Sequence, residues 1–570
     1  MRNPVVMKKL VVLLFISIIF VSHVNGQGEI KLNQVGFYPD SPKIAIVPAG
    51  VDGLFRVVDA ESGEMVYEAH LAEPLYWEFS GEDVSIADFS ELTMPGRYRL
   101  EHPAAGSSYD FEISDEIFRE LSKASIKAFY FNRASTELKE EHAGIRARPK
   151  GHPDDVVYIH ESAASPERPE GTVISSPKGW YDAGDYNKYA VNSGISTYTL
   201  LAAYEHYPEY YQNLSLNIPE SGGEMPDLLH EIRWNLDWLL TAQDPYDGGV
   251  YHKVTTKNFS GVVMPHETDE DRFAVMKSTG GTLNFAAVMA AAARVYDKYD
   301  PVFAVKAIAA AKRAWEWALH NPEQYYVQPS DIRTGAYGDR NLSDEFDWAA
   351  AELYITTRND TYWHARNFHE INVGVPSWSY VRPLAWISLA HHRDNLTDAA
   401  DISLIEQRIT EQGDEFLEEF QRSAYGITLG RYDRDFVWGS NGVIGNHSLM
   451  LLQAYRVTHN ENYLNAARAN MDYILGRNAT GYSFVTGFGS KPPMFPHHRQ
   501  SAADRNTDPV PGFVIGGPQP GQQDDCEYPS DLPATTFLDH WCSYSTNEVA
   551  INWNAPLVYL VGAIEHFSNK

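Results

Sequence analysis

The spacing of apolar residues changes once along this 570-residue chain, near Phe118, and this change constrains the fold more than any other feature. Upstream of it, short extended apolar segments alternate with turn residues such as Pro39, Gly63 and Pro95. The expected strands cover residues 43–47, 54–58, 96–100 and 109–113. Several short strands at this spacing predict a small all-β sandwich of the immunoglobulin-like kind.

Downstream of Phe118, apolar residues recur every three or four positions, as they do on one face of a helix. The expected helices cover residues 118–129, 195–204, 226–242, 282–296, 304–318, 346–356, 384–391, 404–420, 448–457, 461–475 and 556–565. Such a succession of helices joined by loops predicts a helical barrel or toroid. The loops carry most of the Gly, Pro, Trp and His residues, so we expect the chemistry on one loop-rich face.

The first residues resemble a secretory signal peptide. Basic residues at the start are followed by an apolar run over 10–21, which is too short to cross a membrane comfortably. We therefore predict a signal peptide over 1–26 and a protein that is periplasmic or secreted.

The remaining chain divides into a predicted sandwich domain over 27–115 and a predicted helical domain over 116–570. Between the last strand and the first helix there is no linker rich in Pro, Gly or Ser. A connection this short predicts that the two domains pack against each other.

Composition excludes some partners. The formal net charge is −30, and such a surface repels nucleic acid and anionic membranes. No later segment is apolar enough to predict membrane insertion. Aromatic residues make up 13% of the chain, and their flat rings suit both sugar stacking and hydrophobic cores.

The chain has two cysteines, Cys526 and Cys542. In an exported protein they are expected to form a disulfide, which would tie down the loop before Glu548; two buried free thiols are the alternative. Two cysteines are too few for a cysteine-rich zinc site, so no such zinc is predicted.

Two acidic motifs carry the strongest chemical signal. Glu548 lies among aromatic, amide and small residues in the segment 537–556, where partial burial could raise its pKa and make it a general acid. Asp182 and Asp185 lie far upstream, in the segment 179–186. Two carboxylate sites in an aromatic-rich chain suggest cleavage of a glycosidic bond. Taken in isolation, an Asp-x-x-Asp is more often a turn or helix cap, and a lone glutamate a solvated helix residue.

Four segments together resemble glycoside hydrolase family 9, a cellulase family, in its subgroup with an N-terminal immunoglobulin-like domain. They are residues 30–39, which match the opening of that domain, 179–186, the base motif, 483–499, the histidine signature, and 537–555, the acidic signature. The resemblance covers essentially the whole mature chain. It implies an (α/α)6 barrel that hydrolyses β-1,4-linked glucans with inversion at the anomeric carbon.

The resemblance also implies roles for the acidic residues. Glu548 would be the general acid and Asp185 the general base, while Asp182 would help to hold the attacking water. In inverting enzymes the two carboxyl groups stand about 6.5–9.5 Å apart, so that a water molecule fits beside the sugar. Gly184 would permit a tight turn that directs both aspartates into one cleft.

Further residues are implied to contact the sugar. By resemblance His497 and Arg499 would hydrogen-bond hydroxyl groups, and Tyr544 would line the catalytic subsite. The alternatives are a surface cluster or metal site for the histidine–arginine segment and a core role for the tyrosine. His266 lies on an expected cleft loop. Candidate stacking platforms, although a tryptophan taken singly is more often a core residue, are Trp180, Trp348, Trp378 and Trp438.

The segment 338–349 resembles one that supplies calcium ligands in the family, with Asp344 and Glu345 as the pair. Calcium needs six to eight oxygens. A further aspartate that relatives place after a downstream tryptophan is Ser379 here. The alternative is that these acids only favour the start of a helix.

The leading prediction is a secreted, monomeric endo-β-1,4-glucanase that needs no cofactor for its chemistry and acts on a β-1,4-glucan. An exo-acting cellodextrinase or β-glycosidase of the same family is the alternative. A non-catalytic carbohydrate-binding protein is a third possibility, but it would be expected to lack one of the carboxylates Asp182, Asp185 and Glu548, and all three are present.

Overall fold

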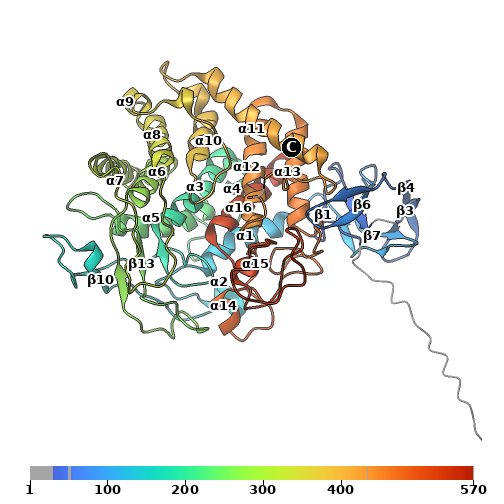
Figure 1. Cartoon of the computed structure of the whole chain (residues 1–570), viewed down its shortest axis with the longest axis horizontal. Helices are drawn as coiled ribbons and strands as arrows, with labels where there is room; N and C mark the ends of the chain where they lie inside the picture. The colour runs from blue at the N-terminus through green and yellow to red at the C-terminus, as the bar shows by residue number, and fades with distance from the viewer. Residues whose placement is uncertain (1–29, 49–52, 433, 569–570) are drawn as a thin grey trace, which may run out of the picture.

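A computed structural model describes residues 30–48, 53–432 and 434–568. The predicted signal peptide, 1–26, lies outside the described residues. The chain forms a small β-sandwich and a large helical domain that lie side by side (Figure 1). Within the described ranges, no helix combines the length and the apolar character that crossing a membrane requires.

The sandwich consists of two sheets. The larger has the strand order β1-β9-β7-β3-β4 with β8 paired to β7, and the smaller has the order β2-β6-β5. The strands are β1 (Gly36–Phe37), β2 (Ile44–Pro48), β3 (Leu54–Asp59), β4 (Met65–His70), β5 (Leu75–Trp77), β6 (Glu82–Asp88), β7 (Gly96–His102), β8 (Gly106–Ser107) and β9 (Phe111–Ile113). Alternate residues of β7 and β9 face inward, and a cluster of buried aromatic rings that includes Phe37 and Phe111 fills the space between the sheets.

Six inner helices of the second domain form a closed ring. They are α3 (Ala190–His206), α6 (Thr279–Tyr296), α8 (Ser343–Thr357), α10 (Arg382–His392), α12 (Ser440–Thr458) and α16 (Ile551–Ser568). Each contacts the next, and α16 returns to contact α3. The outer layer is α1 (Arg119–Phe131), α5 (Asp227–Ala242), α7 (Pro301–His320), α9 (Asp360–His364), α11 (Ile402–Arg422) and α13 (Glu461–Ile474). This arrangement is the (α/α)6 barrel that the resemblance implied.

Helix sequences explain their layer. The inner helix α6 is buried on nearly every side and carries the small-residue run 290–293, which lets neighbouring helices approach closely. The outer helix α11 buries one apolar face, including Ile405, Ile409 and Phe416, and presents charged residues to solvent. The short helices of the domain are α2 (Glu140–Ala143), α4 (Pro208–Gln212), α14 (Arg499–Ala503) and α15 (Tyr544–Asn547).

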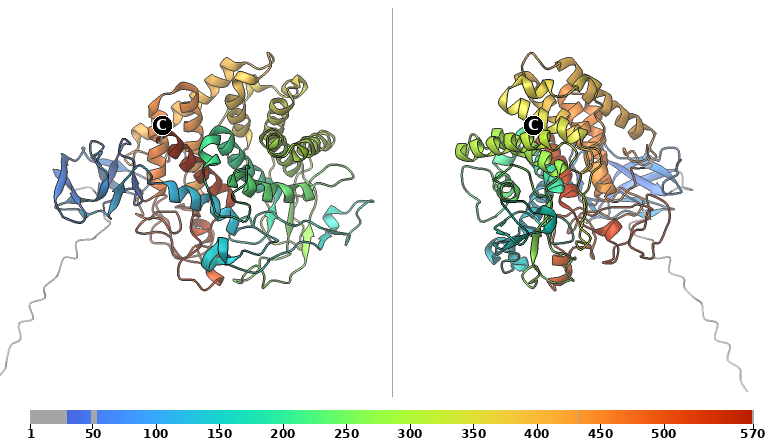
Figure 2. Two further views of the ribbon diagram at one scale, coloured as in Figure 1. Left: turned by 180° about the vertical axis from the view of Figure 1, so that it is seen from behind. Right: turned by 60° about the vertical axis from the view of Figure 1, so that its left-hand side comes forward.

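A third sheet, which the sequence did not predict, lies at one end of the barrel (Figure 2). Its order is β11-β10-β14-β13-β12, and its strands are β10 (Val157–Ile159), β11 (Val173–Ile174), β12 (Lys188–Tyr189), β13 (Lys253–Thr255) and β14 (Arg272–Ala274). Strands of two or three residues are too short to give a readable alternation. Because β12 runs directly into α3, the sheet belongs to the end of the barrel where the inner helix α3 begins.

The sandwich packs firmly on the barrel, as the short connection predicted. The Trp77 ring lies 4.3 Å from the ring of Tyr425 and 6.1 Å from that of Phe436. The Asn33 amide donates to Asp472 at 2.8 Å, and the Tyr38 hydroxyl hydrogen-bonds Glu565. Buried aromatic and polar contacts of this kind make the two domains one packed unit.

Candidate active site

The candidate carboxylates are brought together because the last inner helix, α16, contacts the first, α3. Asp182 and Asp185 lie just before α3, and Glu548 lies just before α16, the helix that contacts α3. The backbone N–H of Ile551 donates to the carbonyl of Asp182 at 2.9 Å, which joins the two loops directly. Residues more than 350 positions apart are therefore neighbours at the loop-rich end, where the chemistry was expected.

Gly184 lets the two loops touch. A Cβ atom there would lie 2.3 Å from the carbonyl oxygen of His497 and 3.1 Å from Oε1 of Glu548. Its backbone N–H donates to the Glu548 carboxylate. Since its φ is not in the left-handed region, glycine is required here for space and not for the turn conformation that we expected.

Asp185 is held through one of its oxygens. Oδ2 accepts hydrogen bonds from the side-chain amide of Asn187, from the Tyr189 hydroxyl at 3.1 Å and from the Asn187 backbone N–H at 3.4 Å. Donors of this kind stabilise a negative charge on the carboxylate. Among the described residues these bonds all end on Oδ2, which leaves Oδ1 able to bind a water molecule.

Asp182 is held through both of its oxygens. Oδ1 accepts from the Asn192 amide and Oδ2 from the Tyr337 hydroxyl, each at 2.7 Å. Burial, followed by repulsion from Asp185, raises the pKa of Asp182 to about 8. Two carboxylates this close do not both ionise readily, so the pair is suited to carry one negative charge near neutral pH.

Glu548 has the environment of a general acid. Desolvation, with further contributions from the charges of Asp185 and Asp182, raises the pKa of Glu548 well above its ordinary value. The residue is half-buried, so that part of it remains open to solvent. A pKa raised in this way favours the protonated carboxyl, which the prediction of a proton donor requires.

Aromatic rings form a wall beside Glu548. The His497 imidazole stacks on Trp541 with ring centroids 4.2 Å apart, and Tyr544 lies 5.8 Å from His497 and 5.3 Å from the exposed ring of Trp438. His497 Nδ1 faces the Trp541 carbonyl at 2.8 Å, and burial lowers the pKa of His497 to about 4. The ring is thus neutral, with its proton on Nδ1 and Nε2 available as an acceptor.

Arg499 lies behind the base loop. Its guanidinium donates to the carbonyl of Gly184 at 2.7 Å and to that of Ser260 at 2.9 Å, and its side chain is buried. These bonds stabilise the loop that carries Asp185. Sugar binding by Arg499 stays a prediction, as does that by His266, whose side chain is exposed on the loop that follows Ser260.

Two of the candidate stacking platforms are core residues. Trp180 and Trp348 are fully buried, and their indole N–H groups donate to Glu231 and Glu352. The prediction that either stacks on sugar is wrong, because neither ring reaches a surface. Trp378 is half-buried and lies 5.2 Å from the ring of Tyr337, which places it beside Asp182.

The predicted disulfide is present between Cys526 and Cys542. Next to the bridge, just outside the loop that it closes, Asp524 accepts hydrogen bonds from the backbone N–H and hydroxyl of Ser545. The Tyr544 hydroxyl donates to the carbonyl of Gln523 at 2.6 Å. The bridge therefore braces the segment that carries both Tyr544 and Glu548.

The proposed calcium pair begins α8. Asp344 and Glu345 are fully buried, and three of their carboxylate oxygens are without a hydrogen-bond partner: Asp344 Oδ1 and both oxygens of Glu345. Asp339 Oδ2 is in the same state. Burial raises the pKa of both residues of the pair, the charge of Asp339 adds to both shifts, and the charge of Asp344 adds to that of Glu345. In the described ranges no group of three or more His, Cys, Asp or Glu side chains is arranged to hold a metal, so an ion here would need further backbone or water oxygens.

The sequence analysis missed several residues of the site. Asn187, Tyr189 and Asn192 follow the base motif directly and could have been considered as its partners. Trp541 lies within the acidic signature, but it is not among the predicted site residues. Tyr337, which donates to Asp182, is 155 positions away and only the fold brings it there.

Comparison with known families decides the identity of the scaffold. A model of glycosyl hydrolase family 9 matches residues 118–561. The chain belongs to glycosyl hydrolase family 9. A model of the cellulase N-terminal Ig-like domain matches residues 25–107, so this family 9 enzyme carries the domain pair that the sequence resembled.

Relatives of this family 9 chain span its length. It is 42% identical over 553 residues to the xyloglucan-specific endo-β-1,4-glucanase BoGH9A of Bacteroides ovatus, covering 94% of this chain and 93% of that protein. It is 33% identical over 548 residues to endoglucanase D of Acetivibrio thermocellus, covering 95% and 84%. The solved structure titled Bacteroides ovatus GH9 superposes with a TM-score of 0.89 at 40% identity, covering 95% of this chain and all of that one.

Proposed function

We propose that this protein is an inverting endo-β-1,4-glucanase whose preferred backbone is that of xyloglucan. The observation that carries the proposal is the meeting of three carboxyl groups with unequal environments at the loop-rich end of the barrel. Asp185 has three donors on one oxygen, whereas Glu548 has its pKa raised by burial and by its acidic neighbours. The xyloglucan preference is supported by the substrate named for the relative that is 42% identical.

In the proposed reaction, Asp185 takes a proton from a water molecule through its available Oδ1. The water oxygen attacks the anomeric carbon while Glu548 gives its proton to the departing glycosidic oxygen. Asp182, whose oxygens already accept two hydrogen bonds, orients the water and limits the negative charge of the pair. After release of product, exchange with solvent restores the protonation of both residues.

The aromatic wall is proposed to hold the glucan beside the acid. Tyr544 and Trp438 offer ring faces, and His497 offers Nε2 as an acceptor for a sugar hydroxyl. Stacking on rings and hydrogen bonds to hydroxyls suit a neutral chain, and the formal net charge of −30 does not oppose such a substrate.

Product analysis tests this function. Purified protein is incubated with xyloglucan, mixed-linkage glucan, cellopentaose and chitosan oligomers, and we expect the fastest cleavage on xyloglucan. Viscosity of the polymer should fall steeply for each reducing end released, and NMR of the first products should show the α-anomer. Release of short oligosaccharides with little loss of viscosity would contradict the endo mode, and a β-anomer would contradict inversion.

We also propose that calcium binds at Asp344 and Glu345, with Asp339 nearby. Four unpartnered carboxylate oxygens in a buried site fit a hard cation that prefers oxygen ligands. The role would be structural, since the pair begins α8 and lies apart from the acid and base. Removing calcium with a chelator should lower the melting temperature, and adding calcium back should restore it. An Asp344→Asn variant should respond less to both treatments, and an equal response in variant and parent would contradict the site.

Export and oligomeric state remain proposals. The disulfide is typical of an oxidising compartment, and the predicted signal peptide accords with it. We propose a secreted or periplasmic monomer. Fractionation of the producing cells and the elution volume of the purified protein test these two statements.

A further inference from the structure

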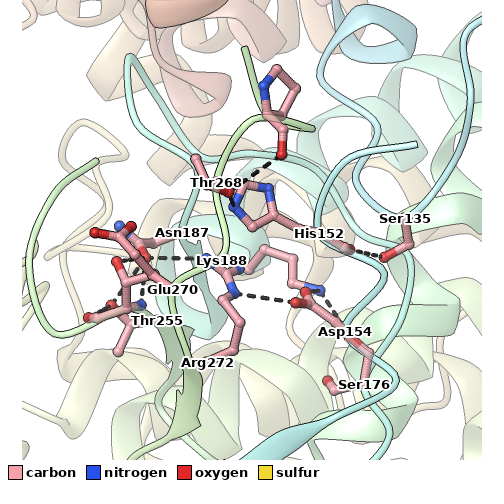
Figure 3. Close-up of polar contacts among 12 residues, drawn as sticks. Ser135, His152, Asp154, Ser176, Asn187, Lys188, Thr255, Thr268, Glu270 and Arg272 are labelled. Atoms are coloured by element: carbon pink, nitrogen blue, oxygen red, sulfur yellow. Dashed lines mark hydrogen bonds and ion pairs between the residues drawn. The ribbon is translucent and has the colours of Figure 1, made fainter. Parts of the chain in front are cut away.

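A network of buried charged side chains lies behind the base loop (Figure 3). Lys188 and Arg272 both bond Asp154, at 2.6 Å and 3.1 Å, and all three side chains are at least nine-tenths buried. Lys188 is on β12 and Arg272 is on β14, strands that flank β13 in the third sheet. Lys188 also donates to the carbonyl oxygens of Ser176 and Lys178. The two cations and one carboxylate therefore tie the sheet to the preceding loops.

Arg272 extends this network to Asn187. One of its terminal nitrogens donates to Oδ1 of Asn187 at 3.4 Å, as the dashed line in Figure 3 marks. The same oxygen accepts from the backbone N–H of Thr256 at 3.0 Å and from the Thr255 hydroxyl at 3.1 Å. Since only donors surround Oδ1, the amide has one acceptable orientation, with its nitrogen directed away from Arg272.

That nitrogen faces the base. Asn187 Nδ2 donates to Oδ2 of Asp185, beside the Tyr189 hydroxyl. Asn187 is 2% exposed, so it lies beneath the surface of the protein and is not placed to contact a bound sugar. Its amide connects a rigid buried network to the oxygen of Asp185 that does not face the water.

We propose that Asn187 is a positioning residue for Asp185, and that Arg272 and Thr256 fix the orientation of its amide. The proposal rests on the assignment of Asp185 as general base. By occupying Oδ2, Asn187 directs Oδ1 toward the water and stabilises the ionised form that can accept a proton. Burying charges is costly unless they are paired, and the pairing here also fixes a group that contacts the base.

Other charged and titratable groups also face Asp185. Asp182 and Glu548 oppose its negative charge. The Tyr189 hydroxyl donates to it, and Arg499 beneath Gly184 supplies positive charge nearby. Lys253 on β13 adds positive charge when it is protonated, and burial lowers its pKa to about 7. These groups are unchanged when only Asn187 is substituted, so a substitution there isolates the contribution of its amide.

The sharpest variant is Asn187→Asp. It keeps the size of the side chain and an acceptor for Arg272 and Thr256, but it replaces the donor facing Asp185 with an oxygen. We expect the acidic limb of the kcat/KM profile to move up by about one pH unit, because a like charge disfavours ionisation of the base. Activity at pH 5 should fall about 10-fold or more and recover partly at higher pH, while KM for cellotetraose stays within about twofold.

Asn470→Asp is the matched control, since Asn470 is also fully buried and hydrogen-bonded through both ends of its amide, but on α13. It should show the stability cost of a buried carboxylate without any shift of the pH profile. Arg272→Lys keeps a cation for Asp154 and should give a smaller loss of kcat than Asn187→Ala. Thermal melts of all variants identify any that fail to fold, and the profile is measured on those that do.

The outcomes separate this inference from the proposed function. If Asp185→Asn keeps near-normal activity, the base assignment is wrong and the inference falls with it. If Asp185→Asn is inactive while Asn187→Asp loses activity equally at every pH, or loses none, only the positioning role is overturned.

Discussion

The acid side and the base side of the site are built differently. Asp185 lies in the loop just before β12, next to a buried ion network. Three donors contact its carboxylate. Glu548 sits between α15 and α16 in a loop braced by a disulfide, and the donor to its carboxyl is the backbone N–H of Gly184. The proposed acid and the proposed base thus differ in environment: burial and the neighbouring carboxylates raise the pKa of Glu548, whereas three donors contact Asp185.

The two sides also rely on different parts of the molecule. The base loop is supported within the helical domain, by the third sheet. The segment that leads to His497 is supported by the sandwich, because Gln34 accepts from the backbone N–H groups of Ser490 and Lys491 at 3.0 and 2.9 Å. Loss of the sandwich contacts should therefore disturb the segment of His497, beside Glu548, before it disturbs the loop of Asp185.

The largest effect is expected from Glu548→Gln and Asp185→Asn. Each should lower kcat on xyloglucan by at least about 100-fold with the fold intact, because the amide can neither donate nor accept the required proton. The comparison predicts that only an activated substrate with a good leaving group rescues Glu548→Gln, since the missing proton then matters less. Rescue of both variants alike would break the division of roles.

A second test of the same residue uses stability. The raised pKa of Glu548 means that its neutral form stabilises the fold, and that this stability is lost as pH rises through that pKa. Glu548→Gln should therefore melt higher than the parent at alkaline pH and similarly near pH 5. Parallel melting curves against pH would contradict the buried, neutral state.

Removal of the sandwich should lower the stability of the protein strongly. Within the site, it should affect the segments that carry His497 and Glu548 more than the loop of Asp185. A protein that starts near Asp115 would expose the surface that Trp77 covers around Tyr425 and Phe436, so we expect a lower melting temperature and aggregation. A truncated protein that is soluble, equally heat-stable and fully active would overturn this.

The milder variant Gln34→Ala removes the acceptor for Ser490 and Lys491 and should cost about 1–3 kcal/mol. It should raise KM more than it lowers kcat. Gln407→Ala, at an exposed position on α11, is the control and should change neither.

Asp182→Asn should have a smaller effect than Asp185→Asn, about 10-fold in kcat, because Asp182 orients water but does not take its proton. Removing its carboxyl also removes a charge that raises the pKa of Glu548, so the basic limb of the profile should move to lower pH. An unmoved basic limb would show that Asp182 does not contribute to the raised pKa of Glu548.

The smallest effect on activity is expected from Cys526→Ser combined with Cys542→Ser. A bridge with a sequence separation of 16 should contribute about 3 kcal/mol to stability. Because it braces the segment of Tyr544, its loss should raise KM modestly and leave kcat within about twofold. A large loss of kcat would mean that the bridge also positions Glu548.

The order of the two domains, the period of the helices and the candidate residues Asp182, Asp185 and Glu548 could be predicted from the amino-acid sequence. These follow from local spacing and from long motifs, which need no knowledge of contacts. The sequence also placed the disulfide, since two cysteines allow one intramolecular pairing. It could not sort the tryptophans, because Trp180 and Trp348 differ from Trp378 and Trp438 only in what surrounds them.

The neighbours of Asp182 and Glu548 could be identified only from the three-dimensional fold. The Tyr337 hydroxyl donates to Asp182 although the two residues are 155 positions apart. Gly184 lies next to Glu548 where the last inner helix, α16, contacts the first, α3. The third sheet is made of strands too short to carry a pattern, yet it holds the network behind Asn187. Burial, neighbouring charge and hydrogen-bond donors depend on packing between distant segments, and they are what give the proposed acid and the proposed base different environments.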